Sequence, residues 1–190
     1  MEHELGGSRM TQRERKELKP EDITVWTDTR EQKPLDLAPL NWERRKLDTG
    51  DYSIRGLEHI VSVERKSLND LLGCIGKHRD RFEREIDRLL AYESRMIVVE
   101  TSWRDLEAGA YQRSRIHPNA AVGAVMGWIA RGIPICLVGN HQLAGKFVAR
   151  FLFTVAKRRW NQLQGLDQSL RVVYGKTPDE IYAPIPPKVV

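Results

Sequence analysis

The sequence predicts an α/β protein in which helices cover both faces of one sheet. Expected strands come first along the chain and then alternate with helices, an order typical of an α/β sheet. The apolar run Met96–Val99 suits a strand buried on both faces, as in a parallel sheet. The chain has 190 residues, of which 41% are hydrophobic and 30% are charged. This is long enough for one globular domain with a real core and leaves little room for a second.

The expected strands are recognised by β-branched and apolar residues between turn signals. They lie at 23–28, 52–54, 59–66, 96–99 and 133–138, with a further extended segment at 42–46.

The expected helices begin at capping signals or carry one apolar face. Ser67 begins a helix because Ser-Leu-Asn-Asp fits a capping box, and Gly73 and Gly76 end or interrupt it. Three more helices are expected at 79–92, 117–131 and 141–162, and a long polar loop at 101–116.

Three segments are expected from composition. Residues 1–20 predict a flexible charged arm, residues 21–162 the folded domain, and residues 163–190 an extended tail with four prolines. Cys74 and Cys136 are too few for a disulfide framework and suit a reducing compartment. No apolar run is long enough to span a membrane and no signal peptide is apparent, so an intracellular protein is expected. Cytoplasm, nucleoid and nucleus are not distinguished.

The net charge of +5 is unevenly distributed. Residues 1–107 carry a net charge of −3, whereas residues 108–166 contain eight Lys and Arg and no acid. An acid-bearing part beside an acid-free basic part suits a protein that binds a polyanion and keeps carboxylates for a metal. A basic surface with no partner is the alternative.

Four charged side chains fall at strand ends and turns: Asp28, Asp51, Glu64 and Lys66. Period two places Glu64 and Lys66 on one face of their strand and Arg65 on the other. Carboxylates are ligands for Mg²⁺ or Mn²⁺, the metal activates a water for phosphodiester hydrolysis, and a nearby lysine stabilises charge. Asp, about a dozen residues and then Glu-x-Lys is the PD-(D/E)xK nuclease pattern.

The surrounding blocks closely resemble the XPF-type structure-specific endonuclease family, in particular archaeal nuclease domains. The resemblance covers about 23–160 and implies a restriction-endonuclease-like central mixed sheet flanked by helices. The blocks that carry it are DTRE (28–31), GDYSI (50–54), ERKSLND (64–70), DRFEREIDRL (80–89), IHPNAAVGAVMGWIARGIPICLVGN (116–140) and AKRR (156–159).

The resemblance implies a role for each matching residue. Asp51 and Glu64 would be metal ligands with the Arg65 carbonyl, Asp28 would be an additional acid at the metal, and Lys66 would be the catalytic lysine. Arg30 and Glu31 would support the site, Arg65 would pair with an acid below the catalytic face, and Asp70 would act in catalysis or only as the capping acid of its helix. Asp48 is expected to be a solvated turn acid, and Tyr52 a core residue.

Two features depart from the family pattern. The family's Gly and Gln in the second helix are Asp80 and Glu85 here, and acids there would repel phosphate. The family's C-terminal helix-hairpin-helix domain, which binds duplex DNA, is not expected within these 190 residues. Substrate binding is then left to the nuclease domain, the arms or a partner, and the sequence leaves open whether a helicase or clamp recruits the enzyme.

Two helices are candidates for contacts with macromolecules. Lys146, Arg150 and Lys157 fall on one face of the last helix and are candidate DNA phosphate contacts or, alternatively, a solvated face. Small residues recur in helix 117–131 and allow another element to approach it closely, either the sheet or a second copy of the helix in a dimer. Members of the family that the chain resembles dimerise through this region. A homodimer is therefore expected. Trp128 is expected in the core or the interface.

The function expected from the resemblance is a Mg²⁺- or Mn²⁺-dependent DNA endonuclease that cuts branched, flap or fork DNA in repair or recombination. Two alternatives stay open: a non-catalytic DNA-binding or scaffold module of the same fold, and a restriction or recombination nuclease that cuts plain duplex.

Overall fold

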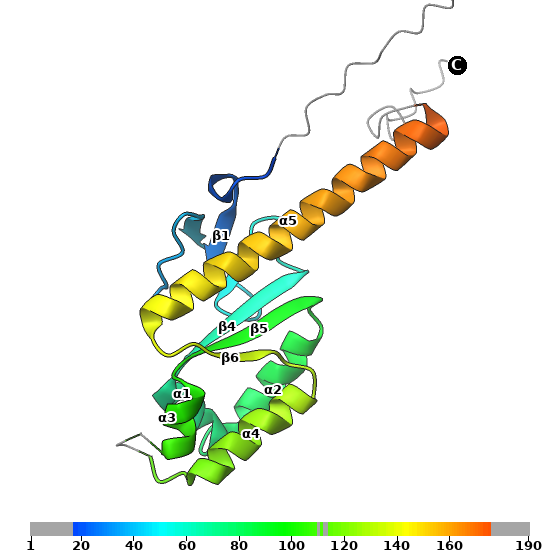
Figure 1. Cartoon of the computed structure of the whole chain (residues 1–190). Coiled ribbons are helices and arrows are strands. Elements are labelled where there is room, and N and C mark those ends of the chain that lie inside the picture. The colour runs from blue at the N-terminus through cyan, green and yellow to red at the C-terminus, as the bar shows by residue number, and fades with distance from the viewer. Residues whose placement is uncertain (1–16, 110, 112–113, 176–190) are drawn as a thin grey trace, which may run out of the picture.

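The computed structural model describes residues 17–109, 111 and 114–175, which form a six-stranded sheet with helices on both faces (Figure 1). The strands are β1 (Thr24–Thr27), β2 (Asn41–Arg44), β3 (Tyr52–Ile54), β4 (Val61–Ser67), β5 (Ser94–Glu100) and β6 (Ile135–Leu137). The helices are α1 (Leu68–Ile75), α2 (Arg79–Leu90), α3 (Trp103–Ala108), α4 (Pro118–Ala130) and α5 (His141–Tyr174), with a short 3₁₀ helix at Pro20–Asp22.

The sheet is mixed, as expected. Its strand order is β2-β1-β3-β4-β5-β6. Strand β1 runs parallel to β2 and antiparallel to β3, β3 is antiparallel to β4, and β4, β5 and β6 are parallel. Strand β4, which carries Glu64 and Lys66, therefore lies inside the sheet, with β3 and the Asp51 turn on one side and β5 on the other.

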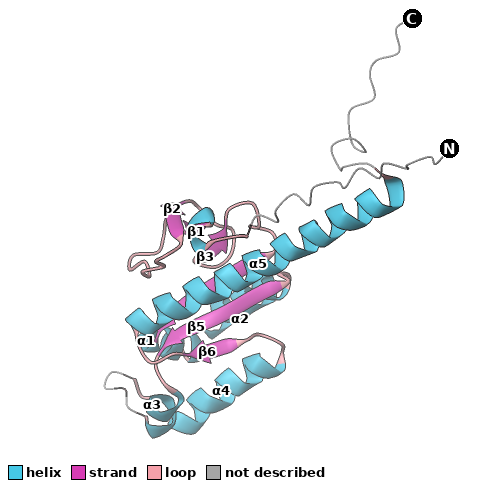
Figure 2. Ribbon diagram, turned by 45° about the horizontal axis from the view of Figure 1, so that its top comes forward, coloured by secondary structure: helices cyan, strands magenta, loops and turns pink. Residues whose placement is uncertain are grey.

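Two apolar cores hold helices to the two faces of the sheet. On one face, α5 packs through Val148 and Leu152 against Val63 and its neighbours. On the other face, α1, α2 and α4 pack over Ile97 and its neighbours. Figure 2 shows α5 crossing in front of the strands while α2 lies behind them.

The edge-to-face pair of Phe82 and Trp128 joins α2 to α4 in the second core. The ring centroids lie 4.8 Å apart at 79°. Trp128 is 2% exposed, and its indole N–H donates to Glu83 at 2.9 Å. The expectation that Trp128 belongs to the core is confirmed, as is that for Tyr52, which is fully buried.

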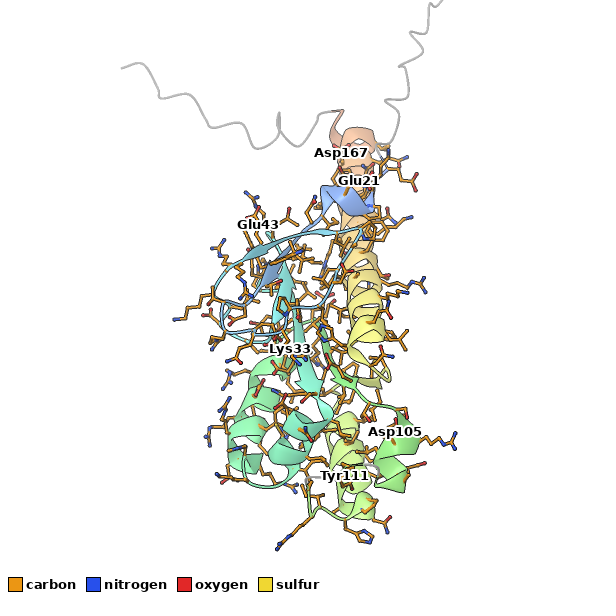
Figure 3. The ribbon with its side chains drawn as sticks, turned by 90° about the vertical axis from the view of Figure 1, so that its left-hand side faces the viewer. Glu21, Lys33, Glu43, Asp105, Tyr111 and Asp167 are labelled. Atoms are coloured by element: carbon orange, nitrogen blue, oxygen red, sulfur yellow. The ribbon has the colours of Figure 1, made fainter. Side chains whose placement is uncertain are left out.

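Helix α5 is longer than predicted, and the expected extended tail is wrong over its first part. The helix continues through 163–174 and is followed by Gly175, whose φ is 63°. One internal glycine, Gly165, does not end it, because a single glycine costs only about 1 kcal/mol in a helix. Figure 3 shows Asp167 on this projecting part, at the opposite end of the molecule from Asp105 and Tyr111. The rest of the predicted tail, residues 176–190, lies outside the described residues.

The expected loop at 101–116 contains a helix, α3. The Ser102 hydroxyl accepts a hydrogen bond from the Asp105 amide at 3.1 Å, and Gly109 ends the helix with a φ of 66°. This Ser-Trp-Arg-Asp cap was the signal that could have predicted it. At α1, Gly76 ends the helix and Gly73 lies within it.

The charged arm expected at 1–20 falls mostly outside the described residues. Its last residues belong to the folded body, since Leu18 packs against the α5-side core and Pro20 begins the 3₁₀ helix. Within the described ranges, no helix combines the length and apolar character needed to cross a membrane.

Candidate active site

A cleft lies between the sheet and the helices α1 and α2. Its volume is about 840 Å³, in the range of ligand pockets and far above that of a single ion. Six of the seven predicted catalytic residues line it, and Asp28 does not. Its ionisable lining residues are Arg30, Glu31, Asp48, Asp51, Glu64, Arg65, Lys66, Asp70, Cys74, His78, Arg81, Glu85 and Arg88.

Backbone contacts hold Asp51 at the edge of the cleft. Gly50 precedes it with a φ of 78°, a conformation that glycine adopts without strain. The Asp51 amide donates to the Val63 carbonyl at 2.8 Å, and its Oδ2 accepts from the Arg65 amide at 2.8 Å. Burial raises the pKa of Asp51 to about 6. The carboxylate is thus rigidly positioned and poorly solvated.

Glu64 and Lys66 form an ion pair on the cleft face of β4. Glu64 is 5% exposed. Burial raises its pKa well above the usual value, and the charge of Asp51 raises it further. Burial lowers the pKa of Lys66, but the charges of Glu64 and Glu85 outweigh it, so the lysine is held as a cation. The face that period two predicted for these two residues is confirmed.

Arg65 points to the other side of the sheet, as predicted, and pairs with two acids. Its Nε lies 2.7 Å from Glu100 Oε1, and its Nη1 lies 3.3 Å from Glu31 Oε1. Glu100 also contacts His141 Nδ1 at 2.6 Å. Arg65 therefore ties the catalytic strand to the loop after β1, to the end of β5 and to the first residue of α5.

Asp28 is a buried hydrogen-bond acceptor for its own loop. Its Oδ1 accepts from the Arg30 amide and Nε, both at 2.7 Å, and its Oδ2 accepts from the Leu47 amide at 2.7 Å and from Arg30 Nη2 at 3.0 Å. Burial raises the pKa of Asp28, but these hydrogen bonds outweigh it and hold the pKa below its usual value. Both carboxylate oxygens are engaged, and Asp28 does not line the cleft, although its amide donates to the Asp51 carbonyl at 2.8 Å.

Arg30 and Asp70 lie at the rim of the cleft. The Arg30 side chain is 65% exposed and is oriented by Asp28 and by the Leu47 carbonyl, 2.8 Å from its Nη2. Ser67 caps α1: its hydroxyl accepts from the Asp70 amide at 3.2 Å and lies 2.6 Å from the Asp70 carboxylate. The predicted helix start at Ser67 is confirmed, with the Asp70 carboxylate contacting the capping hydroxyl, and the place of Asp70 in the cleft lining leaves a catalytic role as a proposal.

The candidate DNA contacts on α5 do not reach the cleft. Lys146, Arg150 and Lys157 are exposed, but α5 covers the opposite face of the sheet from α1 and α2. Lys157 lies 3.7 Å from Glu17 in an exposed ion pair.

Helix α2 supplies cleft residues that the sequence prediction missed. Exposed Arg81 and Arg88 and half-buried Glu85 line the cleft. Their spacing of four and three residues places them on one helix face, a signal present in the sequence. Two other acids of α2, Glu83 and Asp87, pair with Arg131, the residue after α4, and so face away from the cleft.

The carboxylates of Asp51, in the turn before β3, and of Glu64, in the middle of β4, fit a divalent cation. Among the described residues, no group of three or more His, Cys, Asp or Glu side chains is arranged as a ready metal site. Asp51 and Glu64 nevertheless both line the cleft, and burial raises the pKa of each. The charge of Asp51 raises the pKa of Glu64 further. A divalent cation relieves this repulsion, and Mg²⁺ commonly uses one or two carboxylates and keeps several waters.

Comparison with known proteins identifies the family. Residues 13–151 match the ERCC4 domain model, which is more than half of the chain. No curated protein matches the chain.

Two solved chains are similar in structure: XPF from Aeropyrum pernix, and XPF from Aeropyrum pernix in complex with DNA. Both have a TM-score of 0.57, with 20% and 21% sequence identity. The matches cover 70% and 72% of this chain but 61% and 66% of those chains, under two thirds of their length. At this identity the likeness shows the shared fold. The chain belongs to the ERCC4-domain family, and its α/β body has the fold of an XPF-type nuclease domain.

Proposed function

We propose that the protein is a Mg²⁺- or Mn²⁺-dependent DNA endonuclease that hydrolyses phosphodiesters in branched, flap or fork DNA. The observation that carries this proposal is the meeting of Asp51, Glu64 and Lys66 in one cleft whose rim bears exposed arginines. The two neighbouring acids favour a divalent cation, and the arginines attract phosphate. Metal-assisted phosphodiester hydrolysis requires both.

Asp51 and Glu64 would hold the metal, with the Arg65 carbonyl as the third protein ligand. When bound, the metal supplies a water of lowered pKa and neutralises a phosphate oxygen. Asp28, which the family resemblance adds to the metal site, acts in our proposal by orienting Arg30 and the turn at Leu47, because both of its oxygens are occupied.

Lys66 lies in the cleft beside the buried carboxylate of Glu64. Its side chain is 13% exposed, so its attraction for a phosphoryl oxygen is less screened than at the surface. We propose that Lys66 orients the attacking water or stabilises the negative charge that develops on the phosphoryl group.

DNA binding is proposed at two places. Arg30, Arg81 and Arg88 would contact phosphates beside the scissile bond, because they line the cleft. Lys146, Arg150 and Lys157 would contact phosphates only of a DNA arm that passes over α5. A branched substrate offers such additional arms, whereas a single straight duplex in the cleft does not.

A homodimer through α4 is proposed as well. Its outward face carries Gly123 and Gly127, whose Cβ positions would meet no atom within 4 Å, and Met126, which is 50% exposed. A second copy of this helix could approach such a face closely and bury the exposed methionine.

The test is cleavage of labelled flap, fork and plain duplex DNA by the full chain with Mg²⁺ or Mn²⁺. We expect metal-dependent cutting of the branched substrates and none by Asp51→Ala. Equal cutting by the wild type and this variant would contradict the active-site assignment. Comparable rates on duplex and flap would favour the duplex-cutting alternative, and binding without cleavage at either metal would favour the non-catalytic module.

A further inference from the structure

Lys66 lies between two carboxylates from different elements. Besides its ion pair with Glu64 on β4, its Nζ lies 3.4 Å from Glu85 Oε1 on α2. It also lies 5.2 Å from the ring centroid of Phe82, which is on the same helix three residues before Glu85. An ammonium group has three donors, so it can serve both acids at once.

Helix α2 holds this second carboxylate in a fixed place. Phe82 is buried and stacks edge-on against Trp128 of α4, and Glu83 binds both Trp128 and Arg131, the residue after that helix. Glu85 itself is 13% exposed at its side chain. The carboxylate beside Lys66 therefore comes from a packed helix and is itself mostly buried.

The pairing of Lys66 with Glu64 creates a conflict for metal binding. Lys66 and a divalent cation would compete for the Glu64 carboxylate. A buried ammonium group left without a counterion lowers stability. A second acceptor within reach of the ammonium resolves this conflict, because Lys66 can keep a counterion when Glu64 turns to the metal.

We propose that Glu85 is a positioning residue that takes over the Lys66 ammonium when a divalent cation binds Asp51 and Glu64. The inference rests on the proposed function, since it requires that these two residues bind a metal. Glu85 thereby frees Glu64 for the metal and keeps Lys66 in the cleft for the phosphoryl group.

The test is a double-mutant cycle read out by Mn²⁺ affinity without DNA, measured by electron paramagnetic resonance of free Mn²⁺ and by calorimetry. We expect Glu85→Gln to weaken Mn²⁺ binding about 10-fold, as loss of groups that support metal ligands does. In a Lys66→Met background, the same change should weaken it only about 2-fold, because the rival cation is gone. Asp48→Asn is the matched control: it removes an exposed carboxylate from the same cleft lining and should change affinity less than 2-fold.

The possible failures are distinguishable. Equal losses in the wild-type and Lys66→Met backgrounds would overturn the inference, because Glu85 would then act through its charge alone or as a ligand. An unchanged affinity of Glu85→Gln would overturn it as well. No Mn²⁺ binding by the folded wild type, or equal binding by Asp51→Ala, would instead overturn the proposed metal site. Circular dichroism of each variant checks that it is folded.

Discussion

The backbone amide of Arg65 donates a hydrogen bond to the Asp51 side chain, at Oδ2, over 2.8 Å. Asp51 is therefore held directly by β4, the strand that carries Glu64. The hydrogen bond does not compensate for burial, which still raises the pKa of Asp51 from 3.8 to about 6. The protein therefore keeps at this position a charge that lowers its own stability.

Asp51→Asn should stabilise the metal-free protein at alkaline pH. An acid whose folded-state pKa is raised does not lower the free energy of unfolding below pH 3.8, where it is protonated in both states. It lowers that free energy increasingly between pH 3.8 and about 6, and by its full amount above that. We expect the variant to gain about 3 kcal/mol in free energy of unfolding at pH 8 and the gain to vanish near pH 4, as urea denaturation at several pH values would show.

Asp48→Asn is the control for this titration, because Asp48 is exposed in the same turn and should change the free energy of unfolding by less than about 0.5 kcal/mol. Mn²⁺ should stabilise the wild type and not Asp51→Asn. A stability difference independent of pH would contradict the role given to burial.

Arg65→Met should destabilise the fold even though Arg65 does not face the catalytic side. The change would leave Glu31 and Glu100, whose side chains are 6% and 13% exposed, without their main counterion. We expect a loss of about 3 kcal/mol in free energy of unfolding, measured by chemical denaturation. Lys157→Met, which breaks an exposed pair with Glu17, should cost less than about 1 kcal/mol. Similar losses for both would show that the Arg65 pairs are as weak as surface pairs.

Gly50→Ala should be far more damaging than Gly56→Ala, although both glycines have positive φ, 78° and 84°. A Cβ on Gly50 would lie 2.9 Å from the Val63 carbonyl oxygen and closer still to Ser62 Oγ, whereas one on Gly56 would meet nothing within 4 Å. The backbone strain common to both costs about 1 kcal/mol, and the clash adds to it only at Gly50. We expect Gly50→Ala to shift the Asp51 turn and weaken Mn²⁺ binding, and Gly56→Ala to leave that binding unchanged.

The two proposed DNA surfaces should differ in their effects on binding and cleavage. Replacing Arg81 and Arg88 by Ala should lower both DNA affinity and the cleavage rate at saturating DNA. Replacing Lys146, Arg150 and Lys157 by Ala should lower affinity and leave that rate unchanged, because α5 lies across the sheet from the cleft.

Salt titrations of binding by fluorescence anisotropy test these contacts, since each lost phosphate contact should reduce the slope of log affinity against log salt by about 0.9. An unchanged slope for the triple variant would contradict the contacts assigned to α5.

The sequence predicted what is governed by local rules. The alternation along β4 correctly separated Glu64 and Lys66 from Arg65, and the Ser67 capping box correctly began α1. Both follow from neighbours within a few residues.

Contacts between residues far apart in the sequence could not be predicted from these local rules. Nothing local indicates that Glu85 meets Lys66 nineteen residues earlier, or that the Leu47 amide donates to Asp28, which does not line the cleft. The continuation of α5 was missed for a related reason: its outer turns have exposed Leu163 and Leu166 with no sheet beneath them, so the amphipathic pattern that marks the inner turns is lost.

The junction at Glu100 connects the start of α5 to β4. Arg65 of β4 and His141, the first residue of α5, share the same carboxylate oxygen. At about 1.5 Å per residue, the 34-residue helix is a rod of about 50 Å, and its outer turns extend past the sheet (Figure 1). The helix is thus anchored at two places: its first residue is joined through Glu100 to the residue next to Glu64 and Lys66, and Val148 and Leu152 are packed in the core with Val63.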